Sequence, residues 1–323
     1  MIWTDGRKAF AVALVVVALF GAVCLPLFTY TLSLALFGLA HVLSELRYVD
    51  ARFSFRLVRR LRIGFLIFLS AIVLNRLLYA VGLGFHGGIE LILVAGLAAL
   101  VLPECIRAGL LPAFLAVATL VILFLGIGAY PAQTLLFFAI AHNFTPIGFL
   151  AERLKGRERT VALALCSVVF GLIPALIATG AISGVLERLM GLYPDLAFFS
   201  GDALKNHIKV YVPAAWFDSP IALRAFSAAV FTQCMHYAVV IGVLPGLIDA
   251  GPERTLARWP KQPAFAAFLW IGSAAAFVLF CVSFNDARTF YSIPAAVHAW
   301  IEIPLLLLAT TGFGAGAGSR ATT

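Results

Sequence analysis

The sequence predicts an all-α bundle of transmembrane helices, and three observations support this: composition, apolar run length and the placement of basic residues. Of the 323 residues, 63% are apolar and only 12% are charged. A soluble domain of this size carries about 25% charged residues, so most of the outer surface is expected to face lipid. A membrane bundle can use the whole chain as one unit, and we therefore predict a single transmembrane domain over residues 1–323.

Apolar runs of the right length recur along the chain. A helix needs about 20 apolar residues to cross the hydrocarbon layer, and ten runs reach or approach that length: 9–29, 30–47, 62–83, 88–104, 107–128, 131–152, 160–181, 220–247, 264–283 and 289–311. The first is too long for a signal-peptide core and lacks a cleavage site of the A-x-A type. The first two are joined by an uncharged turn near Pro26, and nine spans is the alternative if they are misread.

Basic residues give the orientation, because cytoplasmic loops carry the excess of Lys and Arg. With the N-terminus inside, the inner segments hold 17 basic residues, the outer segments five, and Arg76 lies within a span. The inner set is Arg7, Lys8, Arg47, Arg52, Arg56, Arg59, Arg60, Arg62, Arg107, Arg153, Lys155, Arg157, Arg159, Arg254, Arg258, Lys261 and Arg320. This asymmetry predicts a multi-pass protein of a bacterial-type inner membrane with both termini cytoplasmic. It also explains the net charge of +8 without a nucleic-acid partner.

One long connection, residues 182–219, is predicted on the outer face. Its apolar residues alternate with sparse charges, which is typical of a short amphipathic helix in the membrane interface. Such a helix could form a lid over a cavity open to the outer leaflet. The alternative is an ordinary cap over the helix ends.

Four of the six histidines fall within predicted spans, although ionisable groups inside a bilayer are costly and usually functional. They are His41, His142, His236 and His298, in the second, sixth, eighth and tenth runs. All four spans run from outside to inside, and helical rise places the imidazoles at one depth to within about 10 Å. His86 and His207 fall in predicted outer loops and are not assigned to this group.

Carboxylates accompany two of these histidines at helical spacing. Glu45 follows His41, and Glu302 follows His298, by four residues, which places both members of each pair on one helix face.

The other two histidines have polar neighbours of a different kind. His236 is preceded by Gln233 and followed by Tyr237. After His142, Pro146 cannot bond back to the carbonyl of residue 142, so a bend and a free carbonyl are expected there.

Imidazole is the commonest side-chain metal ligand, and its second nitrogen normally bonds to a carboxylate or a carbonyl. We therefore interpret the four histidines as ligands of a transition metal, with Glu302 or Glu45 as a fifth ligand or as an acceptor behind one. Nitrogen and oxygen donors without thiolates suit iron, with copper and zinc as alternatives. Tyr237 and Gln233 are candidates for orienting an apolar substrate or dioxygen.

Three other interpretations of the histidines remain open. They could bridge helices by hydrogen bonds, two of them could hold a haem from both sides, or a His/Glu chain could relay protons in a transporter. Arg76 is expected to pair with Glu90, Asp286 or a substrate carboxylate. The residues around Asp286 are typical of a helix cap.

The segment His41-Val-Leu-Ser-Glu45 resembles the His-x-x-x-Asp element early in the Brp/Blh family of bacterial membrane oxygenases. The order of His142, His236 and His298 is also similar. Here Val42 replaces the family's glycine and Glu45 its aspartate. The resemblance implies a membrane enzyme that uses non-haem iron and dioxygen on a lipophilic substrate, an isoprenoid such as β-carotene. An acyl chain is the alternative apolar substrate.

Overall fold

The computed structural model describes residues 5–83, 87–199, 203–212, 214–217, 219–248 and 255–312. His86, Arg254 and Arg320 lie outside these ranges, as do the side chains of Arg7 and Lys8. Every regular element within the described ranges is helical. The α-helices are α1 (Asp5–Cys24), α2 (Pro26–Val49), α3 (Arg59–Ala80), α4 (Gly87–Ala108), α5 (Leu110–Ala129), α6 (Pro131–His142), α7 (Thr145–Arg153), α8 (Gly156–Cys166), α9 (Ile173–Ala178), α10 (Ser183–Met190), α11 (Leu204–Tyr211), α12 (Pro220–Gly242), α13 (Ala264–Val282) and α14 (Phe284–Thr310). Short π or 3-10 turns complete them: η1 (Asp50–Ser54), η2 (Ser167–Leu172), η3 (Ala214–Trp216) and η4 (Leu244–Leu247).

Eight helices among the described residues are long and apolar enough to cross a membrane, or nine if the bent pair α6 and α7 forms one span. The apolar part of α1, Ala9–Cys24, is shorter than the others. The ten predicted runs therefore correspond to eight or nine long spans and one shorter helix. Proline at the start of α2 is compatible with a helix N-terminus because its missing N–H would have no intrahelical partner there.

The outer face of the bundle carries large apolar side chains. On α13, for example, Trp270 is 74% exposed, Ile271 71% and Val282 79%. A continuous surface of this kind is not tolerated by a soluble monomer but is suited to lipid. Together with the span lengths, it indicates a multi-pass membrane protein.

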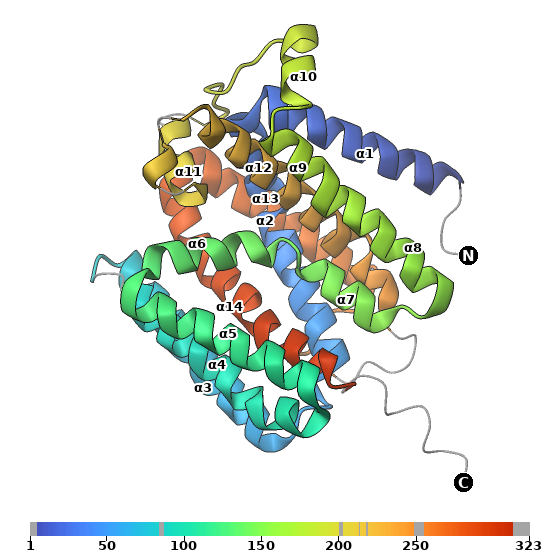
Figure 1. Cartoon of the computed structure of the whole chain (residues 1–323), viewed down its shortest axis with the longest axis vertical. Helices are drawn as coiled ribbons and strands as arrows, with labels where there is room; N and C mark the ends of the chain where they lie inside the picture. Colours follow the sequence, from blue (N-terminus) through green and yellow to red (C-terminus); the bar gives the residue numbers. More distant parts are fainter. Residues whose placement is uncertain are drawn as a thin grey trace.

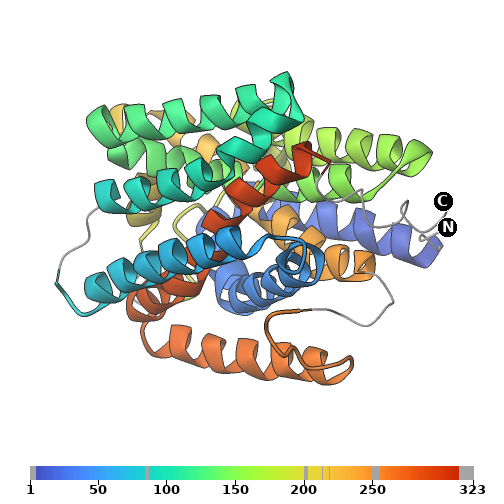
Figure 2. The ribbon, with the colours of Figure 1, turned by 90° about the horizontal axis from the view of Figure 1, so that it is seen from below.

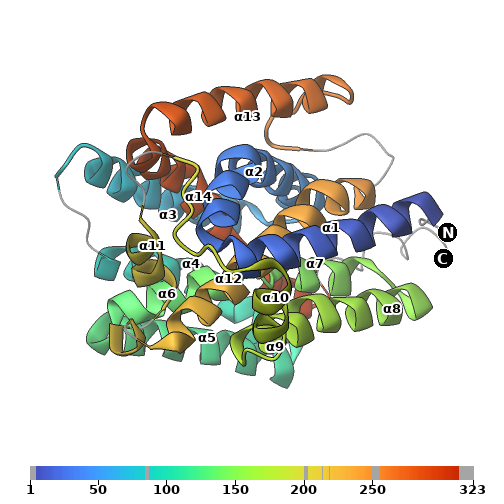
Figure 3. The ribbon, with the colours of Figure 1, turned by 90° about the horizontal axis from the view of Figure 1, so that it is seen from above.

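Most of the long helices lie along a common direction (Figures 2 and 3). In Figure 1, α3, α4 and α5 form one side of the bundle, α1, α8 and α9 the other, and α2, α12 and α14 lie between them. Figures 2 and 3 show α13 at the edge opposite α5. Because α2 packs against both α12 and α14, three of the predicted histidine-bearing helices meet at the centre.

The fourth histidine-bearing span is broken beside its histidine. The axes of α6 and α7 differ by 43°, which confirms the bend expected from Pro146. The carbonyl of His142 is not free, however, since it accepts a hydrogen bond of 2.8 Å from Thr145 Oγ1. The hydroxyl replaces the backbone N–H that proline lacks, a compensation that is common in membrane helices.

The connection over 182–219 contains two short helices, α10 and α11, each with one buried side. Leu186 is buried, whereas Leu189 is 71% exposed. Phe199 packs against Phe284 at the start of α14, with ring centroids 5.1 Å apart. The segment thus covers the helix ends on this side of the bundle.

A buried ion pair joins α3, α4 and α14 away from the histidines. Glu90 is fully buried, and its Oε1 lies 2.6 Å from Arg76 Nη2 and 2.7 Å from Trp300 Nε1. Among the three partners considered for Arg76, the structure thus selects Glu90. Asp286 instead accepts a hydrogen bond from Ser283 Oγ at the N-cap of α14, in agreement with the expected helix cap.

Removal of one partner from this pair should destabilise the fold strongly. Arg76→Leu leaves a fully buried carboxylate without its cation, which costs about 3–5 kcal/mol. Adding Glu90→Gln should recover most of this loss, because the amide oxygen still accepts from Trp300 and carries no charge. Thermal unfolding of both variants in lipid nanodiscs measures the effect. Equal stability of Arg76→Leu and wild type would show that the pair contributes nothing.

Candidate metal centre

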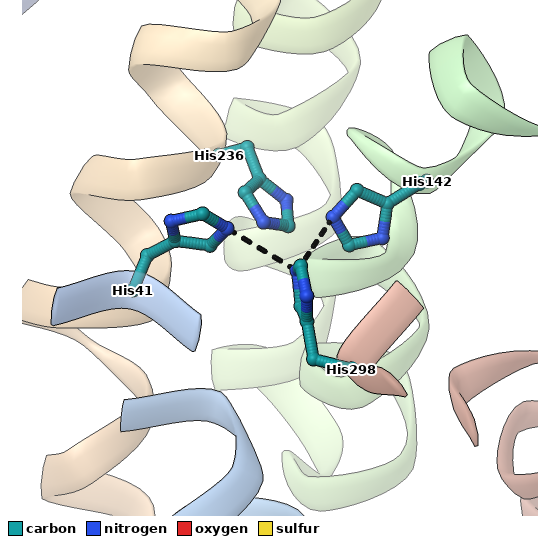
Figure 4. A group of neighbouring side chains, drawn as sticks. All are labelled: His41, His142, His236 and His298. Atoms are coloured by element: carbon teal, nitrogen blue, oxygen red, sulfur yellow. Dashed lines mark hydrogen bonds between the residues drawn. The ribbon is translucent and has the colours of Figure 1, made fainter. Parts of the chain in front are cut away.

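Four imidazoles meet at the centre of the bundle (Figure 4). His41 comes from α2, His142 from the last turn of α6, His236 from α12 and His298 from α14. One ring nitrogen of each lies within 4.8 Å of those of the other three. The structure therefore brings together the four histidines that the sequence placed at one depth.

Two of the imidazoles are oriented by acceptors behind them. Nδ1 of His142 lies 2.8 Å from Glu302 Oε2, and Nδ1 of His41 lies 3.3 Å from the carbonyl oxygen of Phe37. In a neutral imidazole, a proton on Nδ1 leaves a lone pair on Nε2. Both Nε2 atoms face the shared point between the rings, which is the arrangement found for metal-ligating histidines.

The ring nitrogens converge on one another rather than forming a chain. Nε2 of His298 lies 3.2 Å from Nε2 of His41 and 3.1 Å from Nε2 of His142. A single ring nitrogen carries one proton or one lone pair and can make one well-directed hydrogen bond. Hydrogen bonding within the protein therefore cannot satisfy all three nitrogens.

The ring nitrogens of His236 also lack well-formed hydrogen bonds. Its side chain is fully buried and lies near the Asn143 backbone and 3.6 Å from Glu45 Oε2, but neither ring nitrogen makes a hydrogen bond of normal geometry to the described residues. Leaving a buried polar group unsatisfied costs about 1–3 kcal/mol. A ligand bound between the rings would remove that cost.

Two of the nitrogen–nitrogen separations match those around one small cation. Nitrogens bound to an ion at about 2.0–2.1 Å, at right or tetrahedral angles, lie about 2.8–3.4 Å from each other. The two short separations, 3.1 and 3.2 Å, fall in this range. No sulfur belongs to the set, because the five cysteines are free thiols elsewhere in the chain.

Two carboxylates complete the centre. Glu45 and Glu302 are fully buried, and each offers an oxygen within 4.8 Å of a His298 nitrogen. Glu45 Oε2 lies 3.6 Å from His236 Nε2. The carboxyl groups of Glu45 and Glu302 contact each other, and Glu302 also contacts Thr145. No other donor reaches the oxygens of Glu45 or Oε1 of Glu302 with hydrogen-bond geometry in the described part of the chain. Glu302 thus lies behind His142 as an acceptor, while Glu45 lies beside His236 and Glu302.

The other two predicted site residues lie at different distances from the centre. The ring of Tyr237 stacks on His41, with centroids 4.1 Å apart and an interplanar angle of 26°. Gln233 lies one turn earlier on α12, with Nε2 3.5 Å from Ser33 Oγ on α2. Tyr237 therefore borders the centre directly, and Gln233 lies between α12 and α2.

Two further buried residues, one beside the site and one apart from it, were not predicted from the sequence. Trp300 lies on α14 between His298 and Glu302. In the sequence, a tryptophan within an apolar run cannot be distinguished from an ordinary core residue. His207 is also buried and contacts Tyr30 and Arg288, although its segment looks like a surface loop in the sequence. It lies outside the group of four.

No protein-family model, no curated protein and no solved structure matches this chain. The case for a function therefore rests on the geometry of the site.

Glu302→Gln should weaken metal binding while the fold is retained. The amide oxygen can still accept from His142 Nδ1, but the loss of charge lowers the basicity of the ring, and such changes cost about 10–100-fold in metal affinity. Competition with a metallochromic chelator gives the affinity. Glu104→Gln, at the exposed end of α4, is the matched control. Equal affinities for the two variants would mean that Glu302 does not act on a bound metal.

Proposed function

We propose that this protein is a membrane metalloenzyme, an oxygenase with a non-haem iron ion that acts on a lipophilic substrate. The observation that carries the metal proposal is the convergence of His41 Nε2 and His142 Nε2 on the same nitrogen of His298. A cation at the point between the three rings would replace these two competing contacts with three ligand bonds. The imidazole of His236 would provide the fourth ligand bond to the same ion.

Charge supports a divalent cation at this position. Four neutral imidazoles lie beside the carboxyl groups of Glu45 and Glu302 inside a low-dielectric bundle, and the two carboxyl groups would carry two negative charges when both are ionised. One divalent ion neutralises them, and buried charges in membranes are normally paired in this way.

Iron is proposed because of the donor set, since imidazole and carboxylate without thiolate suit iron with positions open for dioxygen. When bound, the iron would supply activation of dioxygen. Glu302 would hold the orientation and tautomer of His142, and Glu45 would offer a further oxygen donor. Tyr237 would fix the plane of His41 and border the substrate. The resemblance of the His41–Glu45 segment to the Brp/Blh family adds an isoprenoid as the substrate candidate.

The geometry favours a metal ion over the two rival functions. A haem between two histidines would have to separate neighbouring imidazoles whose ring centroids lie only 4.5–5.4 Å apart. A proton relay enters an imidazole at one nitrogen and leaves at the other, whereas His298 faces both neighbours with Nε2.

Protein purified without chelators should contain stoichiometric iron and show no Soret band. Inductively coupled plasma mass spectrometry and an optical spectrum of the same sample test this. Stoichiometric zinc or copper would retain the metal site but reject iron. A clear Soret band, or only traces of any transition metal, would reject the proposal.

Single histidine substitutions should show that the four rings act as one site. His41→Ala, His142→Ala, His236→Ala and His298→Ala should each reduce metal content and abolish the rise in unfolding temperature that bound metal confers. His207→Ala is the matched control, because it removes a buried imidazole outside the group. Loss of metal in only one of the four variants would contradict a shared site.

A further inference from the structure

A cavity of about 270 Å³ lies beside the metal centre, between α5, the bent pair α6 and α7, and α14. Its lining along α14 extends from Ala299 to Thr310, a helical rise of about 16 Å. This is roughly half the thickness of the hydrocarbon layer. The cavity is therefore elongated along the span and not compact. None of the residues described as lining it comes from 182–219, so the cavity lies apart from the segment predicted as a lid.

The polar side chains of the lining, with one exception, already donate hydrogen bonds within the protein. The hydroxyls of Thr119, Thr145 and Thr310 each donate to a backbone carbonyl three or four residues earlier in their own span. The indole N–H of Trp300 donates to Glu90. Apart from these groups, the imidazole of His142 is the one polar side chain among the lining residues.

The same histidine is the most accessible of the four. The side chain of His142 is 14% exposed, whereas that of His236 is fully buried. His41 and His298 are each 2% exposed as whole residues. Since His142 also lines the cavity, the cavity is the approach to the metal centre that the structure displays.

We infer that this cavity, lined by α5, α6, α7 and α14, binds the hydrocarbon chain of a lipid-soluble molecule. Because the threonine hydroxyls and the indole N–H already donate within the protein, the lining offers few hydrogen-bond partners and favours a hydrocarbon chain over a polar occupant. The chain lies along α14, with one part against His142. The Arg76–Glu90 pair acts through Trp300, because it holds the indole as a fixed wall of the cavity. The inference rests on the proposed function for chemistry at the His142 end, but the binding itself does not require a metal.

Photolabelling tests the cavity in the full-length protein in nanodiscs. The probes are two diazirine-bearing alcohols, one with a straight C16 chain and one with a prenyl chain, and the cross-linked peptides are located by mass spectrometry. Ala141→Leu projects a larger side chain into the cavity, whereas Ala139→Leu, two residues earlier on α6, adds the same atoms on an exposed face. Thr119→Leu narrows the cavity from α5 and provides a second, independent variant.

We expect at least one probe to label the cavity-lining peptides of α5 and α14 in wild type and in Ala139→Leu. In Ala141→Leu and Thr119→Leu, this labelling should weaken about tenfold, as expected if about two methylenes lose their contacts. Labelling of α13, which faces lipid, is the internal reference. Equal labelling of the cavity peptides in all four proteins, or none in wild type, would overturn the inference.

Metal content measured on the same samples separates this inference from the proposed function. The filled-cavity variants should retain wild-type metal, because Ala141 and Thr119 contribute no ligand. If metal is absent from every sample but the labelling pattern holds, the proposed function fails and the cavity remains a hydrocarbon site. If metal content is normal but the cavity peptides of Ala141→Leu are labelled as strongly as those of wild type, the cavity inference alone fails.

Discussion

The cost of burying ionisable side chains in lipid constrains the centre of this bundle more than any other interaction. Four imidazoles and two carboxylates lie on α2, α6, α12 and α14, where water cannot satisfy them. Their protein partners account for only part of their hydrogen-bonding capacity. A helix bundle could avoid this cost with apolar residues at every one of these positions. The retention of six such groups in contact is therefore best explained by a ligand that compensates them, and a cation is the ligand that their lone pairs suit.

The same molecule provides a comparison for this argument. Glu90 is as deeply buried as Glu45, but its Oε1 receives both a guanidinium and an indole N–H from neighbouring helices. That cluster resembles a structural tie, since its charge is neutralised by the chain itself. The carboxylate of Glu45 has no comparable donor among the described residues. Glu90 thus joins helices through its own partners, whereas Glu45 is suited to bind a ligand from outside the chain.

Much of this arrangement could be predicted from local sequence patterns, and the remainder depends on packing. Run length gave the long spans, and the four-residue spacing correctly placed Glu45 and Glu302 on the faces that carry His41 and His298. Depth in the membrane did not reveal that the four helices touch, nor which nitrogen of each ring points inward. The partner of Arg76 depends on the packing of α3 against α4 and α14. The burial of His207 depends on how 204–211 folds back onto α12, and no periodicity in so short a segment indicates it.

Because of the break between α6 and α7, the backbone at one of the four histidines is held less rigidly than at the other three. His41, His236 and His298 lie within continuous helices, where backbone hydrogen bonds on both sides hold each Cα in place. His142 is the last residue of α6, and the chain after it turns by 43° through a hydroxyl-to-carbonyl bond. The other three histidines keep backbone hydrogen bonds on both sides, although α14 also contains Pro294 and Pro304. His142 alone among the four lies at a break in its span. A change in bond length or ligand number at the cluster would therefore be accommodated most readily at this bend, next to the apolar cavity.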